Sequence, residues 1–181
     1  MKSCCFTGHR FVPEEEKTAL RIELDVTVRR LIKEGVEEFY CGGARGFDTL
    51  AAETVLHLKK TYPFIQLNFI LPCTDQTRFW GKADQQKYSY LLAHSDDVHC
   101  LYEGYRPHCM HERNRELVNA SQTCVCYLKE QDGGTAYTVA YAAKNHKRII
   151  PLGLNREQRE RFENVYLSGQ LDFMEFESAF D

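Results

Sequence analysis

The most restrictive feature of this sequence is the alternation of short apolar runs, typical of strands, with longer amphipathic runs, typical of helices. Strand patterns occur at 2–7, 36–41, 65–71, 98–102, 123–128 and 148–152. Helix patterns lie between them, at 13–35, 47–62, 83–94, 112–120 and 135–145. Strands joined through a helix normally pair in parallel, so we predict an α/β protein with a mainly parallel sheet of about six strands. Right-handed crossovers place helices on both faces, which predicts a three-layer Rossmann-like sandwich.

The length of the chain fits one such sandwich. Its 181 residues, of which 43% are hydrophobic, can bury one full core but not two ordinary domains with a linker. We expect the Rossmann-like domain to span residues 1–152. Residues 153–181 hold 3 basic and 7 acidic residues, against 20 and 19 in residues 1–152. They are predicted to form an acidic C-terminal extension with one helix at 157–167 and a loosely attached end.

Charge and hydropathy argue against several kinds of partner. The near-neutral body lacks the surplus of Lys and Arg that recruits nucleic acid or membrane surfaces without specificity. The most apolar run, residues 64–72, is too short to cross a bilayer, and the first residues do not resemble an export signal. We therefore expect a cytoplasmic protein, in which the eight cysteines stay reduced and mostly buried.

The residues directly after each predicted strand are the candidates for a binding site, because open parallel sheets bind ligands beyond the carboxyl ends of their strands. Thr7, Gly8 and Arg10 follow the first strand. Gly8 allows a ligand to approach the backbone closely, and the guanidinium of Arg10 offers a planar fork of donors for phosphate. A turn glycine followed by a solvated arginine is the alternative interpretation.

The segment after the second strand is the stronger candidate. Gly42, Gly43 and Gly46 allow a nest of backbone N–H groups at a helix start, where an anionic group is stabilised. We expect Arg45 to contact phosphate. Three roles are open to Asp48, namely capping the helix, holding Arg45 or accepting a hydrogen bond from a ribose hydroxyl. The spacing matches neither the Gly-x-Gly-x-x-Gly dinucleotide fingerprint nor a P-loop.

Two further segments are predicted at the same edge of the sheet. Arg113 and Asn114 precede the fifth strand and either reach the crevice or belong to a solvated charged face. Gly133, Gly134 and Thr135 follow that strand at a second glycine-rich helix start, and Thr135 adds a hydroxyl donor for phosphate. Two helix N-termini that suit an anion, at one sheet edge, indicate a phosphate-bearing ligand.

An aromatic side chain and a group of potential metal ligands also need an interpretation. Trp80, the only tryptophan, follows the third strand and either stacks on a nucleobase or is buried against a helix. The potential metal ligands are His99, Cys100, His108, Cys109 and His111. Their spacing matches no Cys-x-x-Cys or His-x-x-x-His pair, so neither a metal nor another cofactor is predicted.

Considered together, the motifs resemble a known group of proteins. They are Thr-Gly-His-Arg at 7–10, Gly-Gly-Ala-Arg-Gly-Phe-Asp at 42–48, Arg-Asn-Arg at 113–115 and Gly-Gly-Thr at 133–135. This set resembles the SLOG superfamily, and the first motif with Trp80 is similar to its YpsA-like branch of uncharacterised bacterial proteins. The resemblance covers about residues 1–152 and implies a Rossmann-like fold whose loops bind a nucleotide-related ligand.

Two other branches imply more specific activities. The second and third motifs are similar to DNA-processing protein A, whose members bind single-stranded DNA. The fourth motif resembles the Gly-Gly-x-Gly-Thr loop of the lonely-guy phosphoribohydrolases, which cleave nucleoside monophosphates at the glycosidic bond. Their catalytic glutamate would fall at Ala136, Tyr137 or Thr138, although this cleavage needs a carboxylate near the cationic sugar. Carboxylates that could replace it in space are Glu112, Glu116, Asp48 and Asp132.

We therefore predict a binding or sensor protein for a nucleotide or a nucleotide-derived phosphate ligand, held by the glycine-rich loops. A nucleoside-monophosphate phosphoribohydrolase is the first alternative. A single-stranded DNA-binding module is the second, and the near-neutral charge of the body disfavours it. Assembly into a homo-oligomer is left open.

Overall fold

The computed structural model describes residues 1–168 and contains a six-stranded sheet. Its strands are β1 (Lys2–Gly8), β2 (Val36–Cys41), β3 (Gln66–Leu71), β4 (Asp97–Cys100), β5 (Thr123–Tyr127) and β6 (Arg148–Pro151). They are ordered β4-β3-β2-β1-β5-β6, and all neighbouring pairs are parallel. The strand order therefore reverses between β1 and β5, and such a switch point is where open parallel sheets bind ligands.

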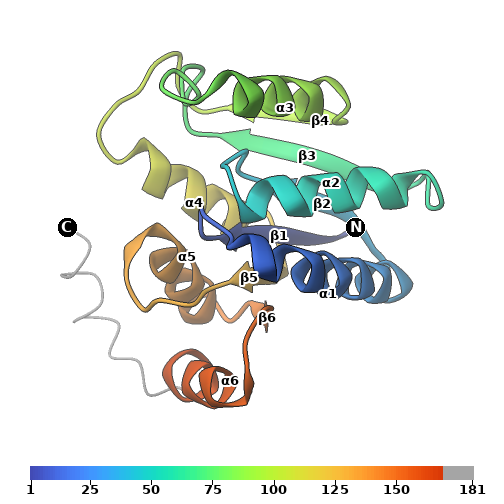
Figure 1. The fold of residues 1–181 in the computed structure, drawn as a ribbon, viewed down its shortest axis with the longest axis vertical. Coiled ribbons are helices and arrows are strands. Elements are labelled where there is room, and N and C mark those ends of the chain that lie inside the picture. The colour runs from blue at the N-terminus through green and yellow to red at the C-terminus, as the bar shows by residue number, and fades with distance from the viewer. Residues whose placement is uncertain (169–181) are drawn as a thin grey trace.

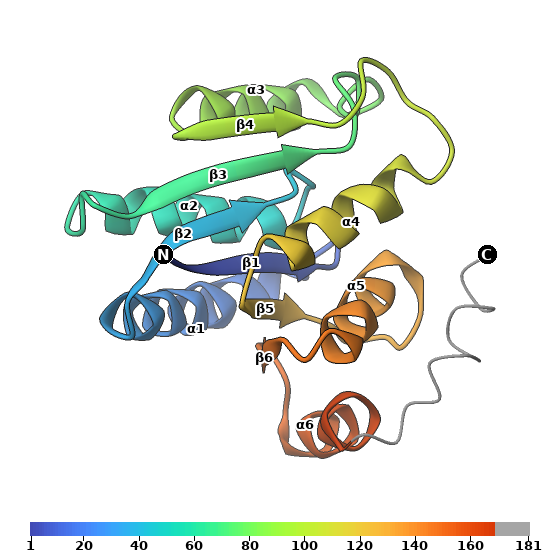
Figure 2. The same ribbon diagram turned by 180° about the vertical axis from the view of Figure 1, so that it is seen from behind.

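Helices cover both faces of the sheet, which gives the predicted three layers (Figure 1). The first face is covered by α1 (Glu14–Lys33), α2 (Phe47–Lys59) and α3 (Lys82–Ala93). The opposite face, turned to the viewer in Figure 2, carries α4 (Cys109–Asn119) and α5 (Gly133–Lys144). On this side α6 (Arg156–Phe162) and a π-helical turn, η1 (Glu163–Leu167), follow β6.

Alternate residues of each strand enter two separate cores. Phe6 and Phe39 pack face to face under α1 and α2, with ring centroids 6.1 Å apart. Cys5, Cys124 and Cys126 enter the second core under α4 and α5. All eight cysteines belong to the described residues, and all are free and at least partly buried, so they act as small hydrophobic side chains.

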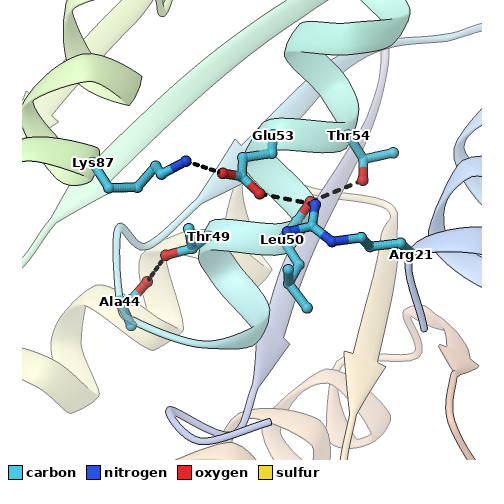
Figure 3. Close-up of polar contacts among 7 residues, drawn as sticks. All are labelled: Arg21, Ala44, Thr49, Leu50, Glu53, Thr54 and Lys87. Atoms are coloured by element: carbon cyan, nitrogen blue, oxygen red, sulfur yellow. Dashed lines mark hydrogen bonds and ion pairs between the residues drawn. The ribbon is translucent and has the colours of Figure 1, made fainter. Parts of the chain in front are cut away.

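Glu53 of α2 joins the three helices of the first face (Figure 3). Its carboxylate accepts hydrogen bonds from Arg21 Nη1 of α1 at 2.9 Å and from Lys87 Nζ of α3 at 2.6 Å. Such partly exposed ion pairs stabilise a fold by about 0–1 kcal/mol each. The helices are therefore held mainly by their apolar faces, and Glu53 adds a polar link between them.

The predicted fold class is confirmed, and the strands and helices differ from the predicted ranges by a few residues. The predicted fourth strand, 98–102, is the four-residue edge strand Asp97–Cys100, after which residues 101–108 form a loop. The helix predicted at 157–167 is present as α6 with η1. The acidic end at 169–181 lies outside the described residues, and the division at residue 152 stays a prediction. Within residues 1–168, no helix is long and apolar enough to span a bilayer.

Candidate functional site

A cavity of about 480 Å³ opens at the switch point, beyond the carboxyl ends of β1 and β5. Its volume lies within the roughly 300–1,000 Å³ that is typical of small-molecule sites. The loops after β1, β2 and β5 and the first turns of α2, α4 and α5 form its walls. The lining residues are Phe6, Thr7, Gly8, His9, Arg10, Ala44, Asp48, Met110, His111, Arg113, Asn114, Leu117, Glu130, Asp132, Gly133, Gly134 and Thr135.

The N-terminal turn of α5 faces this cavity without a cap. Asp132 precedes the helix, but its side chain makes no capping hydrogen bond. Among the described residues, the amides of Gly133, Gly134 and Thr135 have no acceptor outside their own helix. The helix dipole adds about half a positive charge at this end. The turn therefore presents unused N–H donors and a positive potential to whatever fills the cavity.

The glycine-rich loop before α2 is occupied by the protein itself. The amide of Phe47, the first residue of α2, donates to the carbonyl of His9 at 3.1 Å. Gly46 has a φ of +72° and packs so closely on the loop after β1 that a Cβ would lie 2.5 Å from the carbonyl oxygens of His9 and Arg10. This helix start is therefore joined to the neighbouring loop.

Asp48 and Arg113 hold the same loop from inside. Asp48 Oδ2 accepts the amide of Ala44 at 3.2 Å, and the hydroxyl of Thr49 donates to the Ala44 carbonyl at 3.1 Å (Figure 3). Arg113 reaches across from α4 and donates to the carbonyl of Gly42, where a Cβ would overlap its guanidinium. The hydrogen bond of Asp48 fixes the backbone of the loop, and no side chain of the described residues caps α2. Acceptance of a ribose hydroxyl by Asp48, which lines the cavity, stays a prediction.

The two charges are buried together. Arg113 and Asp48 are each 5% exposed. Burial raises the pKa of the Asp48 carboxyl, while Arg113 and the amides of Ala44 and Gly42 oppose the rise. Burial also lowers the pKa of Arg113, and Asp48 opposes that shift. Each charge therefore offsets part of the desolvation of the other. The hydrogen bond from Arg113 to the Gly42 carbonyl is the direct contact that ties α4 to the loop before α2.

His9 joins the two loops of the switch point. Its Nε2 accepts hydrogen bonds from the amides of Lys129 at 2.8 Å and Glu130 at 3.4 Å. The ring packs edge-on against Tyr127, with centroids 5.7 Å apart. Burial lowers the pKa of His9, while the carboxylates of Glu130 and Asp132 oppose the shift. A backbone N–H can only donate, so the ring nitrogen facing the loop carries no proton.

Arg45 and Trp80 contact each other beside the cavity. The guanidinium carbon of Arg45 lies 5.5 Å from the centroid of the Trp80 ring, and its Nη1 lies 3.6 Å from Asp84 Oδ2. Trp80 also packs edge-on against Tyr88, with centroids 5.6 Å apart. Both side chains therefore have partners within the protein, and Arg45 pairs with Asp84 rather than with Asp48.

Most of the predicted site residues converge on the cavity. Those that line it are Thr7, Gly8, Arg10, Asp48, Arg113, Asn114, Gly133, Gly134 and Thr135. Those that do not, in the part of the chain that the structure describes, are Gly42, Gly43, Arg45, Gly46 and Trp80. Sequence reasoning missed His9, Met110, His111 and Glu130 as lining residues. His9 stands inside the first motif and Glu130 lies close to the glycine pair. The sequence indicates His111 only as a potential metal ligand, and Met110 carries no sequence signal.

The charges around the cavity suit a ligand with both an anionic group and hydroxyl groups. Arg10 and the α5 turn attract anions, while the carboxylates of Glu130 and Asp132 can accept hydrogen bonds from hydroxyls. Glu112 and Glu116 do not line the cavity, so its described acidic residues are Asp48, Glu130 and Asp132. Within residues 1–168, no three His, Cys, Asp or Glu side chains gather as metal ligands would.

The fold and this cavity define a Rossmann-like α/β protein with a cavity at the switch point of its sheet. Residues 11–152 match the model of the YspA SLOG family, named YpsA, so the chain belongs to this family and the predicted resemblance is confirmed. A UPF0398 protein of Halalkalibacterium halodurans is 32% identical over 136 residues, which cover 72% of this chain and 71% of that protein. A UPF0398 protein of Shouchella clausii is 32% identical over 127 residues, which cover 68% of each chain.

Two solved structures share the fold at low sequence identity. DNA processing protein A from Helicobacter pylori, whose structure was described for its single-stranded DNA binding mode, superposes with a TM-score of 0.65 and 18% identity. The match covers 90% of this chain and 72% of that one. The protein TM1055 superposes with a TM-score of 0.56 and 20% identity. That match covers 91% of this chain and 82% of the TM1055 chain.

Proposed function

We propose that this chain is a cytosolic binding or sensor protein for a nucleotide or another nucleotide-derived phosphate ligand. The observation that carries the proposal is the uncapped N-terminal turn of α5, which faces the switch-point cavity together with Arg10. Backbone N–H groups, a helix dipole and a guanidinium are the donors that proteins use for phosphate. Membership of the SLOG family supports a nucleotide-related ligand.

Each group at the cavity has a role in this proposal. The phosphate lies on the amides of Gly134 and Thr135, and Arg10 contacts its oxygens with a charge-assisted hydrogen bond. The hydroxyls of Thr7 and Thr135 donate further hydrogen bonds. The carboxylate of Asp132 accepts hydrogen bonds from ribose hydroxyls, because it lies at the cavity directly before the phosphate turn.

Calorimetry with a panel of nucleoside mono-, di- and triphosphates tests the proposal. We expect one class of nucleotide to bind the wild-type protein, with an affinity at least about tenfold lower in Arg10→Ala, or about 1.4 kcal/mol. Arg156→Ala is the matched control, since this side chain on α6 is 94% exposed and lies away from the cavity. Absence of binding across the panel, or an equal loss in both variants, would contradict the proposal.

A nucleoside-monophosphate phosphoribohydrolase is a second candidate, favoured by the position of two carboxylates. Glu130 and Asp132 line the cavity beside the turn that would hold the phosphate. A carboxylate at that place can stabilise the cationic sugar formed when the glycosidic bond breaks. Release of free base from nucleoside monophosphates, lost in Asp132→Asn, would establish this activity. No release by the wild-type protein would exclude it for the substrates used.

A single-stranded DNA-binding module is a third candidate, favoured by arginine–aromatic pairs on loops of the same sheet edge. Arg78 lies over the ring of Phe79 at 5.1 Å after β3, and Arg106 lies over the ring of Tyr102 at 3.8 Å after β4. Phe79 is 88% exposed and can stack on a base. Fluorescence anisotropy with labelled oligonucleotides should then show an affinity that falls steeply with salt and is weakened by Phe79→Ala. A lack of binding at low salt would remove this candidate.

A further inference from the structure

The loop between β5 and α5 carries the uncapped helix turn, and one side chain from another loop holds it in place. His9, on the loop after β1, accepts the amides of Lys129 and Glu130 through a single nitrogen, Nε2. The Glu130 amide is three residues before Gly133, the first residue of α5. The loop is also held by the ion pair of Lys129 Nζ with Glu16 Oε2 of α1 at 3.1 Å, but only the contact through His9 depends on whether a ring can accept a hydrogen bond.

Protonation of the ring changes this contact from attractive to repulsive. Neutral imidazole has one donor nitrogen and one acceptor nitrogen, whereas both nitrogens of imidazolium are donors. A protonated Nε2 would place its N–H against two backbone N–H groups. The contact would open, and both amides would turn to water.

We infer that His9 is a positioning residue of the cavity, whose neutral ring holds the β5–α5 loop against β1 and whose protonation releases that loop. The inference deepens the proposed function and rests on it only for the effect on ligand affinity. The hydrogen bonds at His9 exist in the free protein, so the loop itself can be tested without any ligand.

Several charged groups surround the ring and set where it titrates. On the β5–α5 loop, Glu130 and Asp132 favour the protonated ring and Lys129 opposes it. The hydroxyl of Tyr127 on β5 is bonded to Glu16 of α1 at 2.8 Å. Other charged or titratable groups that line the same cavity are Arg10, Asp48, His111 and Arg113.

Burial is the largest influence on the pKa of His9 and lowers it from 6.5. In a slightly acidic range the unfolded chain then binds more protons at His9 than the folded chain does. The stabilisation by the neutral ring is therefore complete above about pH 6.5 and is lost as the pH falls through the lower pKa of the folded state.

Amide hydrogen exchange followed by NMR on the full-length protein tests the inference. We compare the protection factors of the Lys129 and Glu130 amides at about pH 7.5 and about pH 5, where a histidine changes charge. The Leu152 amide, bonded to the Cys126 carbonyl at 2.8 Å, serves as an internal control. In the wild type, both loop amides should lose about threefold to tenfold in protection on acidification, while Leu152 does not, since one lost hydrogen bond has that effect.

Two variants separate positioning from a general effect of acid. His9→Gln keeps an acceptor oxygen close to the place of Nε2 and cannot be protonated, so its loop amides should stay protected at both pH values. His9→Ala removes the acceptor, so its loop amides should be unprotected at both pH values. A wild-type protein with no pH effect, or an equal loss of protection in His9→Gln, would overturn the inference, even if His9→Ala failed to fold.

A ligand arm uses adenosine 5′-monophosphate as the probe. As the pH is lowered, the affinity of the wild type for this probe should fall more than the affinity of His9→Gln does. Both proteins meet the same probe at each pH, so the titration of its phosphate cancels in the comparison. A relative rise would mean that charged His9 contacts the phosphate directly, and would overturn the positioning role. If no nucleotide binds at all, the proposed function fails, while the exchange experiment still decides on His9.

Discussion

The starts of α2 and α5 lie at the same edge of the sheet, each in a glycine-rich segment and neither with a side-chain cap, yet within residues 1–168 the protein uses the first amide of α2 and none of the first three amides of α5. At α2 the amides of Phe47 and Ala44 are bonded to His9 and Asp48. At α5 the amides of the first turn have no acceptor outside the helix among the described residues. The comparison teaches that a glycine-rich helix start is a potential anion site only where no side chain or loop of the protein uses its donors.

The difference arises from what packs behind each turn. Gly42 is covered by the buried guanidinium of Arg113, and Gly46 by the carbonyls of the loop after β1. For Gly134, the nearest atom to an added Cβ is Asn114 Nδ2 at 3.8 Å, and Gly133 has nothing within 4 Å. The first turn is therefore a structural joint, and the second is the free surface where we propose that phosphate binds.

Loss of Arg113, which holds the loop before α2, should cause the largest change in stability. Arg113→Met removes the charge that offsets buried Asp48, so we expect the free energy of unfolding to fall by about 3–5 kcal/mol. Urea unfolding at pH 7 measures it. The neighbouring Arg115→Met is the control, because this half-buried side chain makes one hydrogen bond, to the Tyr137 hydroxyl at 3.1 Å. Similar losses in both variants would show that the Asp48–Arg113 pair is not the joint.

The same variant has a defined pH dependence. Burial already raises the pKa of Asp48, and the loss of Arg113 removes the largest opposing influence, so the pKa rises further. The folded state then binds a proton more tightly than the unfolded state, whose carboxyl has a pKa of about 3.9. The stability of Arg113→Met relative to the wild type should therefore improve as the pH falls from neutral toward this range. A deficit that is constant with pH would contradict the role of Asp48.

Two alanine substitutions should distinguish the two helix starts through smaller changes in stability. In Gly42→Ala the new Cβ overlaps a buried guanidinium, and we expect a loss of about 1–3 kcal/mol, as for overpacked cores. In Gly134→Ala the methyl group meets no close atom, so stability should rise by about 0.4–1 kcal/mol while nucleotide affinity falls, since the methyl group enters the cavity. Urea unfolding measures the stability of each variant, and calorimetry measures its nucleotide affinity. Equal destabilisation of Gly42→Ala and Gly134→Ala would contradict the proposed difference between the two helix starts.

The smallest effect is expected at Arg45, which the sequence alone indicated as a phosphate contact. Its guanidinium is engaged by Trp80 and Asp84 and does not line the described cavity. We expect Arg45→Ala to lower nucleotide affinity less than about threefold, compared with at least about tenfold for Arg10→Ala. Calorimetry on the two variants side by side decides the matter. A tenfold loss at Arg45 would bring the α2 start back into the binding site.

Much of the fold followed from pattern alone, because each strand and helix is specified by residues next to one another in sequence. The period of apolar residues separated strands from helices, and the helix between consecutive strands favoured a parallel sheet. The convergence of Gly8, Arg113 and Gly133 on one cavity followed from the same topology. The contacts of Arg45 and Trp80 did not follow from the topology, because each depends on a side chain of α3: Asp84 for Arg45 and Tyr88 for Trp80.

The sequence by itself determined which loops meet, since the carboxyl ends of parallel strands lie at one edge. Only the tertiary structure decided which of their donors are free. Arg113 reaches the Gly42 carbonyl across 71 positions of sequence, and His9 reaches the Lys129 amide across 120. Hydrogen bonds over such separations depend on how helices and loops pack, and packing is a property of the whole core rather than of any motif.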